Sequence, residues 1–252
     1  MEIGRLLTAM ITPFDENGEV NYEMSAKLAK AIIDSGSDGL VIGGTTGEAP
    51  TISDEEKLKL FSVVKESIGP DHALIAGTTN NNTKESVKLS KLAESTEVDG
   101  LLLTVPSYNK PTQDGLYKHF KSISEEVSIP CILYNVPSRT SLNMTDETTI
   151  KLSELKNIVG IKEASSDLDQ ITKIISNTSN DFKVWSGNDN ETLYILSAGG
   201  YGIVSVAGHI VSSQIKQLIG HVLEGNIEVA GKEHQRLLEF TICPATLTIP
   251  YP

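Results

Sequence analysis

The sequence predicts an α/β protein in which eight parallel strands close into a (β/α)8 barrel. Eight short apolar runs alternate with eight longer helical patterns along the chain. The runs are almost continuously apolar, as expected for parallel strands that are covered on both faces. The 252 residues match a fold that takes about 250, and no Pro/Gly/Ser-rich linker divides them. A doubly wound open sheet is the second candidate, because it shares this alternation.

The expected elements follow one another in eight strand–helix units. The strands are Leu6–Thr12, Leu40–Ile42, Ala73–Gly77, Gly100–Val105, Cys131–Asn135, Val159–Lys162, Lys183–Ser186 and Gly202–Val206. The helices are Tyr22–Ser35, Asp54–Ile68, Thr83–Ser95, Gln113–Ser128, Asp146–Leu155, Leu168–Ser176, Glu191–Ala198 and Val211–Leu223. Ser53 and Glu56 form the S-x-x-E pattern of a capping box, and Gly36, Gly69 and Gly199 mark helix ends.

The chain continues beyond the eighth unit. One more helical stretch, about Ile227–Phe240, is followed by the sequence TICPATLTIPYP. Pro244, Pro250 and Pro252 make this tail a poor helix, because proline lacks the backbone N–H that a helix needs. We therefore expect a barrel over residues 1–224 and a short helical extension over residues 225–252.

Composition argues against several classes of partner. The net charge of −12 and pI of about 4.9 disfavour binding to nucleic acid and to anionic membranes. No apolar run approaches the length of a membrane span, and the first residues lack the pattern of a signal peptide, so we expect a cytoplasmic protein. Cys131 and Cys243 form no disulfide framework, and Cys131 is expected to be a buried free thiol. The five histidines show no metal-ligand spacing, so no metal site is expected.

Lys162 is the strongest candidate for a chemical role. It ends the apolar strand IVGIK, and the loops that follow barrel strands form the active-site face. Burial disfavours the charged form of an amine, and a neutral amine can attack a carbonyl carbon to form a Schiff base. The alternative is a lysine whose stem packs in the core while its ammonium reaches solvent.

Other polar residues lie at neighbouring strand ends. Tyr134 could relay protons, or pack as a core tyrosine with its hydroxyl at the rim. Thr45 and Thr46 lie between glycines, where hydroxyls and backbone N–H groups would suit a small carboxylate, although a plain turn is equally consistent. Arg139 could bind a carboxylate or lie in solvent, and Tyr108, on a proline-flanked loop, could belong to an active site or to an interface.

Taken together, these segments resemble the dihydrodipicolinate synthase / N-acetylneuraminate lyase family of class I aldolases. The resemblance covers residues from about 3 to 240 and rests on seven motifs in order: TPF, GGTTGE, AGTT, YNKP, YNVPSRT, GIKEAS and SGND. It implies a (β/α)8 barrel, a Schiff base between Lys162 and pyruvate, no metal and no organic cofactor. It also implies small-molecule substrates and a homodimer or homotetramer.

The resemblance further implies individual roles. Tyr134 would carry protons in a relay with Thr45 and with Tyr108, which would enter from a neighbouring subunit. Thr46 and the backbone near Val204 would hold the pyruvate carboxylate and its surroundings. An arginine at position 139 favours aspartate 4-semialdehyde as the second substrate, in lysine and diaminopimelate biosynthesis, because its carboxylate needs a positive partner.

Two departures from the family keep alternatives open. The family's lysine-inhibition pocket maps to Ala49, Asp54, Lys57, Asn81, Glu85 and Ser107, of which only Asn81 and Glu85 fit the sensitive pattern, so we expect weak or absent inhibition by lysine. The family also usually continues for a few dozen residues beyond this C-terminus. The alternatives are a sugar-acid aldolase of the N-acetylneuraminate lyase or 2-keto-3-deoxygluconate type, a truncated inactive relative that binds or regulates, and, more distantly, a doubly wound nucleotide-binding protein.

Overall fold

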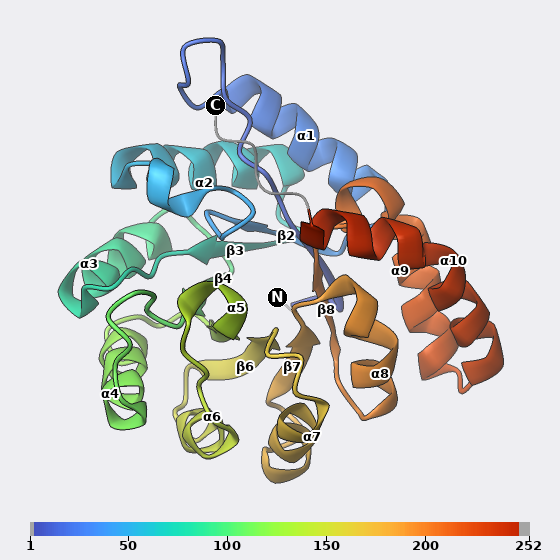
Figure 1. Cartoon of the computed structure of the whole chain (residues 1–252). Coiled ribbons are helices and arrows are strands. Elements are labelled where there is room, and N and C mark those ends of the chain that lie inside the picture. The colour runs from blue at the N-terminus through green and yellow to red at the C-terminus, as the bar shows by residue number, and fades with distance from the viewer. Residues whose placement is uncertain (1–2, 247–252) are drawn as a thin grey trace.

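The computed structural model describes the backbone of residues 3–246 and the side chains through residue 241. Eight parallel strands pair in the order of the sequence, and β8 pairs with β1, so the sheet closes (Figure 1). The predicted barrel is therefore confirmed, and the open doubly wound sheet is wrong. The strands are β1 Leu6–Ala9, β2 Gly39–Ile42, β3 Ala73–Gly77, β4 Gly100–Thr104, β5 Cys131–Asn135, β6 Ile158–Glu163, β7 Lys183–Ser186 and β8 Gly202–Ser205.

Helices surround the barrel (Figure 1). Most of those around the strands begin with a side chain that accepts a hydrogen bond from the first turn. The predicted capping box of Ser53 and Glu56 is present, with both reciprocal hydrogen bonds. Glycines with positive φ follow three helices as predicted: Gly36 (φ 116°), Gly69 (φ 75°) and Gly199 (φ 99°). The helices around the strands are α1 Tyr22–Asp34, α2 Asp54–Ile68, α3 Thr83–Glu94, α4 Gln113–Ser124, α6 Asp146–Ser153, α7 Leu168–Asn177, α8 Thr192–Ser197 and α9 Gly208–Leu223.

Some element boundaries differ from the prediction, and the first strand differs most. The expected strand Leu6–Thr12 ends at Ala9, which pairs with Val41 near the end of β2, while β8 pairs with β1 only as far as Thr8. Met10 still donates to the Val41 carbonyl oxygen at 3.0 Å, but the N–H of Ile11 donates to His209 Nε2 instead. Three short helical turns were not predicted: η1 Ala49–Thr51, α5 Pro137–Thr140 and η2 Asp189–Glu191.

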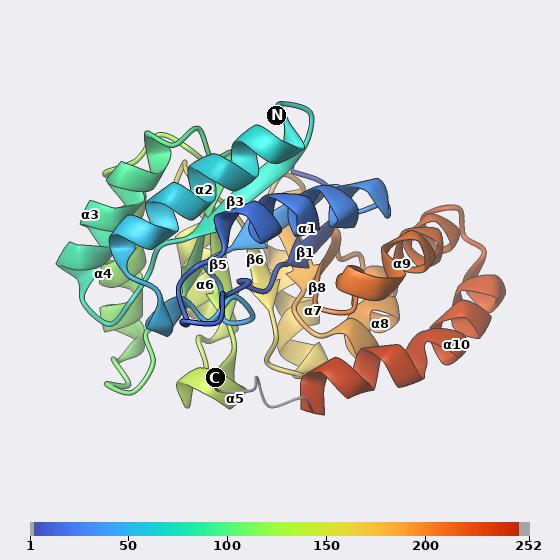
Figure 2. The ribbon, with the colours of Figure 1, turned by 90° about the horizontal axis from the view of Figure 1, so that it is seen from above.

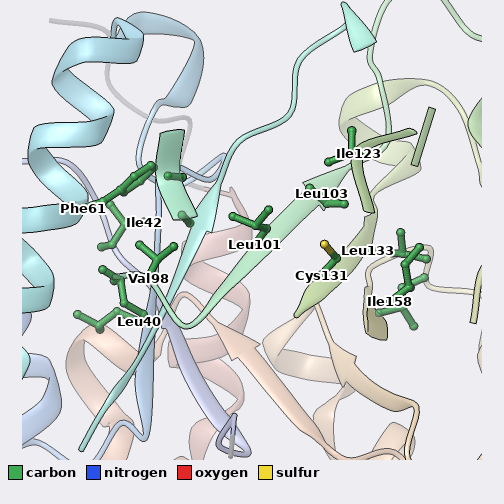
Figure 3. Close-up of a cluster of buried hydrophobic side chains, with 14 of the residues drawn as sticks. Leu40, Ile42, Phe61, Val98, Leu101, Leu103, Ile123, Cys131, Leu133 and Ile158 are labelled. Atoms are coloured by element: carbon green, nitrogen blue, oxygen red, sulfur yellow. The ribbon is translucent and has the colours of Figure 1, made fainter. Parts of the chain in front are cut away.

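Two apolar layers hold the barrel together. One fills the barrel interior and includes Tyr134, Trp185 and Val204. The other lies between the strands and the helices, and Figure 3 shows part of it, with Phe61 of α2 close to β2. Cys131 lies in this outer layer, fully buried, and burial raises the pKa of its thiol to about 12. The prediction of a buried free thiol is confirmed for Cys131, whereas the side chain of Cys243 lies outside the described part.

The last helix, α10 Ile227–Thr246, packs against α9 on the outside of the ring (Figure 2). It extends six residues beyond the expected end at Phe240 and includes Pro244, so the prediction of a poor helix is wrong for that part. The rest of the tail, with Pro250 and Pro252, lies outside the described residues. Among the helices described, none is both long and apolar enough to cross a membrane.

Candidate active site

Lys162 and Tyr134 lie side by side at the carboxyl ends of β6 and β5. They are directly paired in the strand register, and each is the penultimate residue of its strand. The Lys162 Nζ atom lies 4.2 Å from the centroid of the Tyr134 ring. Both side chains are only 4% exposed. The structure therefore brings the predicted nucleophile and the predicted proton carrier together at the end of the barrel where barrel enzymes place their sites.

The space around Lys162 depends on a glycine. A Cβ atom added to Gly187, just after β7, would lie 2.7 Å from the Ala164 Cβ and 3.2 Å from the Lys162 Cε. A larger residue at this position would push the lysine stem aside. Within the described part of the chain, the Lys162 ammonium makes no hydrogen bond and no ion pair within 4.0 Å. Its nitrogen therefore has no fixed polar partner among the described residues.

Asp189, the last residue of the SGND motif, is a buried carboxylate near Lys162 for which the sequence predicted no role. It accepts hydrogen bonds from the Ser205 hydroxyl and from the backbone N–H groups of Val206 and Ala207, the last two at 3.0 and 3.2 Å. Burial raises the pKa of Asp189, while these hydrogen bonds and the Lys162 charge act in the opposite direction. Its position in the loop just after β7, at the active-site end of the barrel, was the signal that could have identified it.

The GGTTGE loop follows β2 at the same end of the barrel. Thr12, from the TPF motif, donates its hydroxyl to the Gly47 carbonyl oxygen at 2.7 Å, which fastens this loop to the segment after β1. Thr45 and Thr46 are partly exposed. The fold thus places both threonines at the predicted end of the barrel, but no contact between them and Lys162 or Tyr134 is recorded.

The three remaining candidate site residues differ in their exposure to solvent. Val204 is buried in β8 and belongs to the same interior cluster as Tyr134. Arg139 lies in α5, after β5, and is exposed. Tyr108 follows β4 and is 89% exposed, with a positive φ of 68° and a hydrogen bond of 2.7 Å across it from the Asn109 N–H to the Ser107 carbonyl oxygen. A turn of this kind is strained, and it projects the tyrosine away from the body of its own subunit.

Two other predictions concern histidines and metals. His119 and His234 lie on helices, where surface or packing positions are expected, and both are buried, at 6% and 8% exposure. Burial lowers the pKa of His119 to about 4, so its ring is neutral at pH 7. Among the described residues, no group of three or more His, Cys, Asp and Glu side chains could hold a metal ion. The site therefore offers an amine, a phenol and a carboxylate, a set suited to carbonyl chemistry through an imine.

Comparison with known proteins supports this chemistry. The profile of the Dihydrodipicolinate synthetase family matches residues 2–247. A 4-hydroxy-tetrahydrodipicolinate synthase from Dehalococcoides mccartyi is 54% identical over 236 residues, which are 94% of this chain and 80% of that protein. The crystal structure of a lysine-bound dihydrodipicolinate synthase from Cyanidioschyzon merolae superposes with a TM-score of 0.96 at 42% identity, covering 98% and 85% of the two chains. A structure described as the first monomeric dihydrodipicolinate synthase variant gives 0.94 at 40% identity, covering 98% and 84%.

Proposed function

The chain belongs to the dihydrodipicolinate synthetase family, and we propose that it acts as a 4-hydroxy-tetrahydrodipicolinate synthase, condensing pyruvate with aspartate 4-semialdehyde. The observation that carries this proposal is the enclosed Lys162, whose Nζ lies 4.2 Å from the centroid of the Tyr134 ring at the carboxyl end of the barrel. Identity of 54% to a synthase, together with an arginine at position 139, favours this reaction over that of a sugar-acid aldolase.

The first half of the reaction would take place on Lys162. Its neutral amine attacks the carbonyl carbon of pyruvate, water leaves, and an imine forms. The protonated imine nitrogen withdraws electrons, so that a methyl proton leaves and an enamine results. Tyr134 would move these protons, in a relay with Thr45 and Tyr108. Thr46 and the backbone near Val204 would hold the pyruvate carboxylate.

The second half would join the two substrates. The enamine carbon adds to the aldehyde carbon of aspartate 4-semialdehyde, and the aldehyde oxygen takes up a proton. Arg139 would receive the carboxylate of this substrate, because a guanidinium can bind both carboxylate oxygens at once. The amino group of the joined product then displaces the Lys162 amine from the imine carbon, which closes the ring and frees the lysine.

Borohydride trapping tests the proposal. Reduction in the presence of pyruvate should convert the imine into a stable secondary amine, which intact mass and peptide mapping would locate at Lys162. Steady-state assays with aspartate 4-semialdehyde and with sialic acid would then identify the second substrate. Absence of the adduct in folded protein would contradict the proposal, and turnover of sialic acid alone would replace the synthase by a lyase.

We also propose that the active form is a homodimer or a homotetramer. Support comes from Tyr108, which is 89% exposed and thus free to enter the site of a neighbouring subunit. Mixing the two inactive variants Tyr108→Phe and Lys162→Ala tests this, because mixed dimers regain one complete site. Random exchange should then restore roughly a quarter of the parental activity. A monomer in light scattering, with no recovery on mixing, would contradict it.

The cytoplasmic location expected from the sequence stays a prediction that cell fractionation can test.

A further inference from the structure

Glu163 is a fully buried carboxylate that the proposed reaction does not use. It follows Lys162 directly on β6, but alternation along a strand turns its side chain to the opposite face, toward the helix layer. It is 0% exposed, and no lysine, arginine or histidine side chain of the described residues pairs with it within 4.0 Å. An unpaired buried carboxylate is costly, so its presence calls for a role.

Every recorded partner of Glu163 is a hydrogen-bond donor. The Asn135 amide donates to it at 3.1 Å, the backbone N–H of Ser165 at 2.9 Å, and the Gln170 amide at 3.3 Å. These three groups come from β5, from the loop after β6 and from the first turn of α7. Both carboxylate oxygens of Glu163 accept hydrogen bonds, so Glu163 requires that both amides turn their NH2 groups toward it.

The two amides in turn hold the segment that follows α5. The Asn135 oxygen accepts from the backbone N–H of Met144 at 3.0 Å, and its NH2 group also donates to the Asn143 side chain at 2.7 Å. The Gln170 oxygen accepts from the Asn143 amide at 2.8 Å. From the outside, Gln113 of α4 donates to the Asn143 carbonyl oxygen at 2.8 Å. Residues 143–144 are therefore clamped against β5 and β6 by a connected set of directed hydrogen bonds.

Arg139 lies between the two ends of this clamp. The chain leaves β5 at Asn135, passes through α5 with Arg139, and returns to the clamp at Asn143. Its backbone N–H donates to the Val136 carbonyl oxygen at 3.0 Å, but within the described residues its guanidinium makes no ion pair or hydrogen bond. The place of its guanidinium therefore depends on the backbone of residues 136–142, and both ends of that backbone are held by the groups around Glu163.

We propose that Glu163 is a positioning residue for the second substrate: through Asn135, Asn143 and Gln170 it holds the loop that presents Arg139 to the carboxylate of aspartate 4-semialdehyde. This inference rests on the proposed function. It assigns the two consecutive residues of β6 to the two substrates, with Lys162 bonded to pyruvate and Glu163 supporting recognition of the aldehyde.

The main test is the nearly isosteric change Glu163→Gln. The new amide would place an NH2 group opposite the Gln170 or Asn135 NH2 group. Neither of these can turn without losing the Met144 or Asn143 contact. The KM for aspartate 4-semialdehyde should rise at least about tenfold, as expected for a weakened charge-assisted pair. The KM for pyruvate and the borohydride adduct on Lys162 should be retained.

A double-mutant cycle shows whether Glu163 acts through Arg139. Arg139→Ala should raise the same KM, and adding Glu163→Gln should raise it little further, because the two changes remove one interaction. Asn157→Ala is the matched structural control: Asn157 directly precedes β6 and donates to the Ser124 and Val127 carbonyl oxygens at the opposite end of the strand. It should lower stability and leave the KM for aspartate 4-semialdehyde unchanged.

The outcomes separate this inference from the proposed function. An unchanged KM for aspartate 4-semialdehyde in folded Glu163→Gln protein, or fully additive effects in the cycle, would overturn the role of Glu163. A parent protein that forms no adduct with pyruvate would instead overturn the proposed function. Should Glu163→Gln not fold, Gln170→Leu removes one donor from Glu163 and the contact to Asn143, and it should raise the same KM severalfold. An unchanged KM there would overturn the role equally.

Discussion

Each face of β6 carries one buried ionisable side chain, and the two side chains differ in their hydrogen bonding. The Lys162 ammonium, on the inner face, lies over the Tyr134 ring and makes no hydrogen bond to any described residue. Glu163, on the outer face, accepts hydrogen bonds from Asn135, Ser165 and Gln170. Both are nearly inaccessible to solvent. The difference teaches that burial alone does not identify a reactive group. On β6 the candidate nucleophile lacks a hydrogen-bond partner for its ammonium, whereas the carboxylate beside it in sequence is bonded by several donors.

Removing the inner-face amine should have the largest effect. Lys162→Arg keeps a positive charge but cannot form an imine, so kcat/KM should fall at least about a thousandfold and the borohydride adduct should disappear. Lys183→Arg, at the start of the neighbouring strand β7, is the matched control and should keep near-parental activity. Substantial turnover by Lys162→Arg would show that Lys162 is not the nucleophile, and the functional contrast between Lys162 and Glu163 would then be wrong.

Crowding the inner face should have a smaller effect. In Gly187→Ala the added methyl group meets the Ala164 Cβ and the Lys162 Cε, so the lysine must move, and the cost in stability should be about 1–3 kcal/mol. Gly187→Ala should form the imine with pyruvate several times more slowly than the parent protein. The rate is measured by adding borohydride at successive times and determining the amount of trapped adduct. Gly231→Ala in α10, where an added Cβ meets nothing within 4 Å, should be neutral or stabilising. Equal trapping rates in both variants would show that the space at Gly187 is unimportant.

The outer face should be visible in the pH dependence of stability. Burial raises the pKa of Glu163 from its ordinary 4.5 to about 7, against the opposing effect of its hydrogen bonds. The folded protein therefore binds a proton at Glu163 more tightly than the unfolded chain does. The stability that this group contributes is complete below about pH 4.5 and is lost as the pH rises through about 7.

Urea unfolding at several pH values measures this contribution. In the parent protein, Glu163 should lower the free energy of unfolding between about pH 4.5 and 7. Relative to the parent, Glu163→Gln should show a flatter profile over the same range. Parallel profiles would mean that Glu163 does not titrate in this window, and its carboxylate would then be ionised throughout.

The smallest expected effect concerns a region away from both faces of β6. Lys57, in α2, is largely buried, and its ammonium lies 3.9 Å from the Asp54 carboxylate. An internal ammonium in the region that matches the family's lysine pocket should repel the ammonium groups of free lysine. We therefore expect initial rates to change little when lysine is added. Strong inhibition in a lysine titration would contradict this, and Lys57→Ala would then show whether the repulsion is real.

Much of the fold was predictable because its signals are local. Ser53 and Glu56 lie three residues apart and cap a helix whose bounds, Asp54–Ile68, were predicted without error. The end of β1 was missed because it depends on where β2 stops, 33 residues later in the chain. Pro244 was expected to exclude a helix, but it lies in the last turn of α10, where it removes one backbone hydrogen bond and only two residues follow it in the helix.

The candidate site divides in the same way. Lys162 and Tyr134 could be predicted because both end apolar strands and belong to motifs with a known order. Asp189 and Glu163 were present in quoted motifs, SGND and GIKEAS, but received no role, because their significance lies in their partners. Those partners are Ser205 for the first and Gln170 for the second, and no spacing in the sequence links them.

The sequence by itself determined the class of fold and the family and supplied the candidate nucleophile, because apolar periodicity and ordered motifs are properties of the chain alone. Only the tertiary structure decided which buried groups are satisfied and which are not. Closing the barrel pairs Tyr134 with Lys162 on the inside and Asn135 with Glu163 on the outside, one residue further along each strand. Hydrogen-bond satisfaction is a property of groups brought together in space, and for that reason adjacent residues of one strand could acquire opposite roles.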